Sequence, residues 1–114
     1  MPAPTPPWRP HVAAVVFGPQ KGASPDTAER LSAMIELYRS RAIVDWNINA
    51  AGTVPAEIAT MATMGIAAFK VFMVVDTGRS YPHMPGIGVH HHGKLLEIFE
   101  TIAPTGVALM VHPH

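Results

Sequence analysis

The sequence predicts an α/β fold in which about four parallel strands alternate with helices, as in a portion of a (β/α)8 barrel. Apolar runs of strand length alternate along the chain with amphipathic segments of helix length. The central run, residues 65–73 (GIAAFKVFM), is apolar on both faces, which is typical of a parallel strand covered by helices. The chain has 114 residues. A closed barrel needs roughly 250 residues, so we expect about half of one.

Composition excludes several classes of function. The formal net charge is zero and 14% of the residues are charged, so no basic surface for nucleic acid or for an anionic membrane is expected. No apolar run reaches the roughly 18 residues that span a bilayer. Cysteine is absent, which is consistent with a reducing cytoplasm. We expect the chain to form homo-oligomers because a partial barrel leaves sheet edges exposed.

The N-terminal third should contain an arm, a strand and a helix. Residues 1–10 (MPAPTPPWRP) are Pro-rich and are expected to be a flexible arm, which leaves residues 11–114 as the barrel segment. HVAAVVF at residues 11–17 predicts a strand. Asp26 is expected to cap a helix from Thr27 to about Arg41, with Glu29 completing a capping box. The apolar stripe of this helix would comprise Leu31, Met34, Ile35, Leu37 and Tyr38.

The middle of the chain repeats this alternation. Residues 42–48 predict a strand and residues 49–54 a loop. Pro55 fits the first turn of a helix that Gly65 ends. The residues expected to face inward from this helix are Ile58, Met61, Ala62 and Met64.

The last third should contain a strand, a long connection, a helix and a final strand. The strand that carries Lys70 is followed by an irregular segment, residues 76–91, and by a helix over residues 93–103. GVALMVHPH at residues 106–114 predicts the last strand. The helix would turn Leu95, Leu96, Ile98, Phe99 and Ile102 inward.

Lys70 is the first candidate for chemistry. Strand alternation places it on one face with Ala68 and Phe72, and an unpaired ammonium in such an apolar run would cost several kcal/mol. It could snorkel to solvent and be purely structural. Alternatively it could act as a Schiff-base nucleophile, or react with carbon dioxide to give a carbamate that bridges two metal ions.

Histidines supply the other candidates. A histidine at the end of a buried strand is more often structural than a metal ligand. His112 and His114 end the last strand two residues apart and therefore share a face, which strengthens the case for metal binding. Residues 90–92 (HHH) lie between two glycines, a pattern that favours the start of a helix over metal binding.

GIAAFKVFM and LMVHPH together resemble the cyclic amidohydrolases of the dihydroorotase, hydantoinase and allantoinase group. The first motif is similar to that group's strand with a carboxylated lysine, and the second to the next strand with a metal-binding histidine. The resemblance covers roughly residues 12–112.

The resemblance implies a metal-dependent hydrolase of cyclic amide C–N bonds with two divalent metal ions, most simply zinc. Carboxylated Lys70 would bridge the metals and His112 would bind one of them, with His114 as a further candidate ligand. In the segment after the lysine strand, Tyr81 and His83 are candidate substrate contacts.

The sequence also departs from the family. No His-x-His pair precedes Lys70, and Val75 stands where hydantoinases have a substrate-holding tyrosine. The later histidine and the catalytic aspartate of the family would lie beyond His114. Two alternatives therefore stay open: a non-catalytic barrel-derived scaffold or oligomerisation module without metal, and a Schiff-base lyase or aldolase that uses Lys70.

Overall fold

The computed structural model describes residues 13–16, 25–73 and 88–113, and of residues 13–16 the backbone alone. The Pro-rich arm at residues 1–10 lies outside the described residues. The elements in chain order are β1 (Ala13–Val16), α1 (Ala28–Arg41), β2 (Asp45–Ala51), α2 (Pro55–Ala62), β3 (Ala68–Phe72), α3 (His92–Ile102), the 3-10 turn η1 (Ala103–Thr105) and β4 (Leu109–His112). The predicted alternation of strands and helices is confirmed for the described part of the chain.

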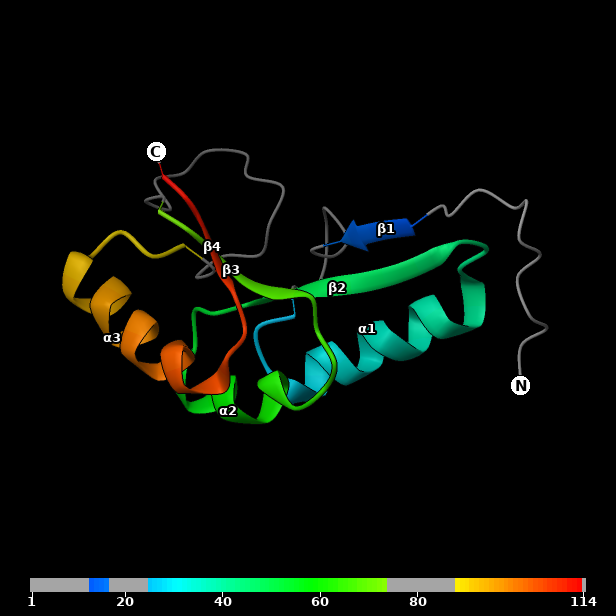
Figure 1. The fold of residues 1–114 in the computed structure, drawn as a ribbon, viewed down its shortest axis with the longest axis horizontal. Coiled ribbons are helices and arrows are strands. Elements are labelled where there is room, and N and C mark those ends of the chain that lie inside the picture. The colour runs from blue at the N-terminus through cyan, green and yellow to red at the C-terminus, as the bar shows by residue number, and fades with distance from the viewer. Residues whose placement is uncertain (1–12, 17–24, 74–87, 114) are drawn as a thin grey trace.

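The four strands form one parallel sheet whose spatial order, β1-β2-β3-β4, equals their order in the chain. In Figure 1 the three helices lie together on one side of this sheet. Each strand therefore pairs with its sequence neighbours, and each connecting helix returns over the same face. The protein is an α/β fold with a parallel sheet, as the sequence predicts.

The core lies between the helices and the near face of the sheet. The strands contribute residues at alternate positions, because successive side chains point to opposite faces. The fully buried side chains include Ile48, Phe69 and Val71 from the sheet and Leu31, Ile58, Met61 and Ile98 from the helices. Burying a side chain of this size contributes about 1.5–3 kcal/mol, so this layer stabilises the arrangement of strands and helices.

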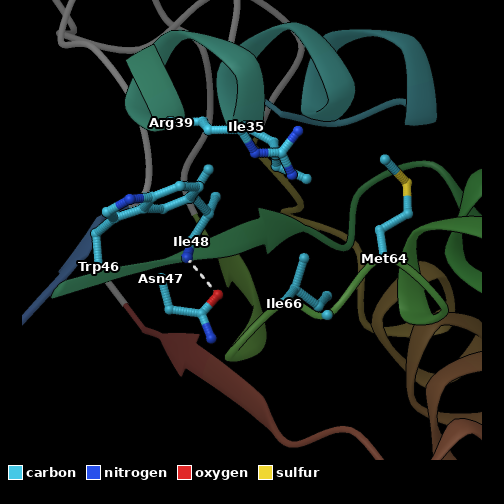
Figure 2. Close-up of a pocket in the computed structure, with 8 residues that line it drawn as sticks. Ile35, Arg39, Trp46, Asn47, Ile48, Met64 and Ile66 are labelled. Carbon is cyan, nitrogen blue, oxygen red and sulfur yellow. Dashed lines mark hydrogen bonds between the residues drawn. The ribbon is translucent and has the colours of Figure 1, made fainter. Parts of the chain in front are cut away.

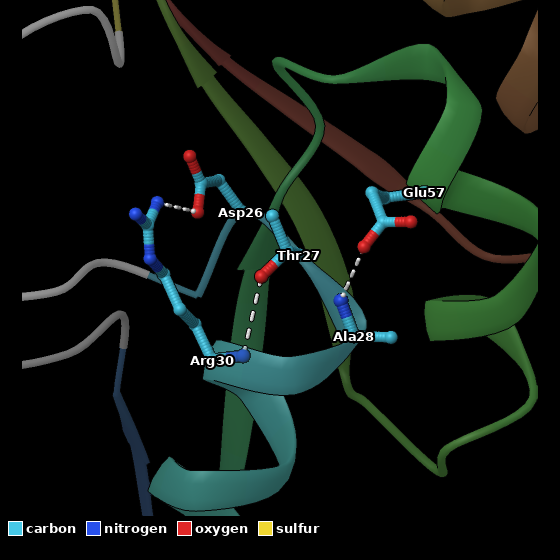
Figure 3. A network of polar contacts seen from close by, with 5 residues as sticks. All are labelled: Asp26, Thr27, Ala28, Arg30 and Glu57. Atoms are coloured by element: carbon cyan, nitrogen blue, oxygen red, sulfur yellow. Dashed lines mark hydrogen bonds and ion pairs between the residues drawn. The ribbon is translucent and has the colours of Figure 1, made fainter.

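The start of α1 differs from its prediction by one residue. Thr27 is the N-cap and its hydroxyl accepts the Arg30 N–H at 3.2 Å, so Asp26 is not the cap and Glu29 completes no capping box. Asp26 is buried and pairs instead with the Arg30 guanidinium at 2.7 Å. Glu57 of α2 accepts the Ala28 N–H at 2.9 Å and so joins the two helices (Figure 3).

The prediction for β2 is wrong by three residues at both ends. The strand begins at Asp45 and continues to Ala51, whereas the sequence predicted residues 42–48 with a loop from Asn49. Ile43 lies before the strand and is 90% exposed, so its apolar character did not mark a buried position. Asn47 and Asn49 look like loop residues, yet both belong to the strand and alternate there with Ile48 and Ala50.

Glycines shape the connections around β3. Helix α2 ends at Ala62 with Thr63 as its C-cap, earlier than the predicted stop at Gly65. Gly65 lies in the turn that follows and adopts φ of +79°, a left-handed conformation that is strained for other residues. Gly52 follows β2 and is buried; a Cβ there would lie 3.2 Å from Ile102 Cδ1 and 3.3 Å from Val71 Cγ1. The Gly52 N–H donates to the Lys70 carbonyl at 3.0 Å, which places the end of β2 against the centre of β3.

Three predicted core positions are wrong. Leu37 of α1 is 46% exposed, and Leu96 and Phe99 of α3 are 56% and 43% exposed. A helix with one apolar stripe buries only the residues in the middle of that stripe. In α3 these residues are Ile98 and Ile102.

Among the described residues, no helix combines the length and apolar character needed to cross a membrane.

Candidate functional site

The far face of the sheet is the side turned away from α1, α2 and α3. Register assigns side chains to it, because residues paired on adjacent parallel strands point to the same side. Lys70 pairs with Ala51 on β2 and with Met110 on β4, and Phe72 pairs with His112. The side chains assigned to the far face from β2, β3 and β4 are therefore those of Asn47, Asn49, Ala51, Ala68, Lys70, Phe72, Met110 and His112.

Lys70 lies at the centre of β3, half-buried between four buried neighbours in the strand. Its position follows from the alternation of the strand: Phe69 and Val71 enter the core with no exposed area, so the residue between them must point to the far face. The predicted division of this strand into two faces is confirmed.

Phe72 connects the two predicted metal ligands. The Lys70 Nζ atom lies 4.8 Å from the centroid of the Phe72 ring, within the range of a cation–π contact. The His112 ring lies on the other strand with its centroid 5.4 Å from that of Phe72. The fold therefore brings Lys70 and His112 to one face of adjacent strands, around a shared aromatic ring.

Asn49 is a further candidate residue of the far face, which the sequence interpretation missed. It pairs in register with Ala68, and Lys70 lies two residues after Ala68 on the same face. The residue is only 9% exposed, and within the described part of the chain its Oδ1 atom is buried without a hydrogen-bond partner. The signal in the sequence is the alternation Asn47-Ile48-Asn49-Ala50, which has the period of a strand although asparagine is rare in strands.

The other candidate residues from the sequence are Tyr81, His83, His114 and the tripeptide at residues 90–92. Tyr81, His83 and His114 lie outside the described residues. His90, His91 and His92 are exposed, and His91 caps α3 by accepting the Gly93 N–H on Nδ1 at 3.1 Å. The prediction that this tripeptide starts a helix is confirmed.

Lys70 and His112 are the two predicted metal ligands that lie on the far face. Within the described residues, no group of three or more His, Cys, Asp or Glu side chains could hold a metal ion. An imidazole and a carbamate oxygen are both suitable zinc ligands. His112 and carboxylated Lys70 therefore fit two ligand positions of a larger set.

A separate cavity of about 200 Å³ lies on the helix side, near the start of β2 (Figure 2). The lining residues are Ile35, Arg39, Trp46, Asn47, Ile48, Met64, Gly65 and Ile66. The Asn47 Oδ1 atom accepts the Ile48 N–H at 2.7 Å, so this acceptor is already in use. Lys70, His112 and Asn49 are not among the lining residues, and Asn47 is the far-face residue that also borders this cavity.

No protein-family model, no curated protein and no solved structure matches this chain.

Proposed function

We propose that this chain carries part of the active site of a metal-dependent cyclic amidohydrolase, within a portion of a (β/α)8 barrel. The reaction would be hydrolysis of a ring amide C–N bond in a small cyclic amide, as in the dihydroorotase, hydantoinase and allantoinase group. The observation that carries the proposal is the position of Lys70 and His112 on one face of adjacent parallel strands, with Phe72 between them.

The sheet topology supports the barrel part of the proposal. In a (β/α)8 barrel the strands follow chain order, the helices form an outer layer and the far face becomes the interior. The order β1-β2-β3-β4, with α1, α2 and α3 on one side, has this character. His112 is the last residue of β4, and barrel active sites lie at the carboxyl ends of the strands.

Each residue would have a defined role. Lys70, as its carbamate, would present two oxygens to metal, and His112 would present one ring nitrogen. A bound metal pair would supply a hydroxide at neutral pH and polarise the ring carbonyl. Phe72 packs against both side chains and would restrict their movement.

We also propose that the site is completed by association. Among the described residues, β1 and β4 each pair on one side only, so each leaves an edge that can accept another strand. A second copy would raise the number of strands from four to the eight that close a parallel barrel. The absence of cysteine favours the cytoplasm as its location.

Metal content tests the proposal. Protein purified with zinc and bicarbonate should bind about two metal ions per chain, the number expected for a bridged pair. Lys70→Ala and His112→Ala should lose most of this metal, whereas Lys94→Ala and His91→Ala, which change the same residue types on α3, should retain it.

Two results would favour the alternatives to a metal-dependent hydrolase. A folded protein with no metal under these conditions would contradict the proposal and favour a non-catalytic scaffold. Trapping of Lys70 by borohydride with a carbonyl compound would favour the Schiff-base alternative.

A further inference from the structure

Asn49 has a buried oxygen for which the proposed roles of Lys70 and His112 give no use. Among the residues that the structure describes, the Oδ1 atom has no hydrogen-bond partner although Asn49 is only 9% exposed. An acceptor in this state costs about 1–3 kcal/mol relative to a satisfied one. A donor that reaches this atom in another state of the protein would therefore be bound favourably.

Lys70 is placed to supply that donor. Asn49 pairs with Ala68, and Lys70 lies two residues further along β3 on the same face. Strand spacing and rise put the two Cα atoms about 8 Å apart along this diagonal, within reach of a four-carbon stem and a short amide. The intervening positions on the face are Ala51 and Ala68, so only methyl groups stand between the two side chains.

Carboxylation changes which partner suits Lys70. The ammonium lies over the Phe72 ring, whose negative face attracts a cation. When the neutral amine attacks carbon dioxide, an N–C bond forms, one proton leaves to solvent, and the product carries a negative charge. The ring face repels that charge, and the nitrogen keeps one N–H that needs an acceptor.

We propose that Asn49 is the positioning residue for carboxylated Lys70, with its Oδ1 accepting the remaining N–H of the carbamate. Lys70 thus has two positions on the far face: over Phe72 as the ammonium, and bonded to Asn49 as the carbamate. This inference rests on the proposed function, because that function requires the carbamate.

Carbon-13 NMR of protein in labelled bicarbonate tests the proposal without metal or substrate. The sequence contains only Lys21, Lys70 and Lys94, so the carbamate signal can be assigned with Lys70→Arg. Asn49→Leu and Asn49→Ala should each lower the Lys70 carbamate population about fivefold, the factor that corresponds to one ordinary hydrogen bond. Using both variants separates loss of the oxygen from a change of volume.

Asn47→Ala is the matched control, because Asn47 lies on the same strand and face but its oxygen is already bonded to the Ile48 N–H. It should leave the carbamate population unchanged. A normal carbamate signal in both Asn49 variants, with the fold intact, would overturn the role of Asn49 and leave the proposed function standing. The absence of any Lys70 carbamate from the unmodified protein would overturn both.

Discussion

Asn47 and Asn49 show how two identical side chains on one strand face can differ in what they contribute. Asn47 is half-buried and its oxygen is bonded to the Ile48 N–H at 2.7 Å. Asn49 is more deeply buried, and its oxygen has no partner among residues 25–73 and 88–113. We therefore expect the first side chain to stabilise the fold and the second to lower its stability.

Asn49→Leu should therefore stabilise the protein. Leucine has nearly the same shape and removes the unpaired acceptor, so the free energy of unfolding should rise by about 1 kcal/mol. Asn47→Ala should lower it by a similar amount because a satisfied bond is lost. Urea unfolding followed by circular dichroism measures both changes. A loss of stability in Asn49→Leu would show that the amide has a structural partner.

The elements were predicted in kind and order because each long segment has one clear period. Helix α1 spans Ala28–Arg41 against a predicted 27–41, and the position of Lys70 within its strand follows from alternation alone. The bounds of β2 could not be predicted in this way. Its asparagines are typical of loops, and they belong to the sheet because Asn47 pairs with β1 and Asn49 pairs with β3.

The candidate residues differ in how far the sequence points to them. Lys70 and His112 could be named as candidates because each interrupts an apolar run, and whether they form a metal site stays a prediction. Asn49 could not be named, because an unpaired acceptor is a property of the packed structure. Likewise, Asp26 and Thr27 are both good caps in sequence, but in the structure Asp26 pairs with the half-exposed Arg30 side chain and Thr27 caps α1.

The contact between α1 and α2 through Glu57 can be tested at the level of the elements. Glu57→Ala leaves the first N–H of α1 without its acceptor and should lower the free energy of unfolding by about 1 kcal/mol. Glu57→Gln keeps an acceptor oxygen and should retain most of the stability. Thermal unfolding measures both. Equal losses in the two variants would mean that the charge, and not the hydrogen bond, is what stabilises this junction.

At the scale of the whole molecule, the sheet formed by the described strands has two edges and a far face that the described helices do not cover. Met110 lies on that face of β4, next to Lys70, and is 39% exposed. Leu96 is also exposed, at 56%, but lies on α3. If a second copy completes the sheet, the far face is enclosed and the outer surface of the helices remains in solvent.

Self-association should therefore depend on Met110 and not on Leu96. Sedimentation velocity at increasing protein concentration should show a dimer for the unmodified chain. Met110→Glu should shift the equilibrium to monomer by at least about tenfold, because a carboxylate would be buried without a partner. Leu96→Glu should sediment as the unmodified chain does. A stronger effect of Leu96→Glu would place the interface on the helices.

The equality of spatial and chain order in the sheet also bears on how the protein is made. A strand that emerges from the ribosome finds its neighbour already synthesised, since β2 needs only β1, β3 only β2 and β4 only β3. In a sheet whose later strands insert between earlier ones, two early strands can pair only after the later strand has been made, or must separate to admit it. Here every stage of synthesis leaves an unbroken sheet with one growing edge, so assembly can proceed strand by strand in the direction of translation.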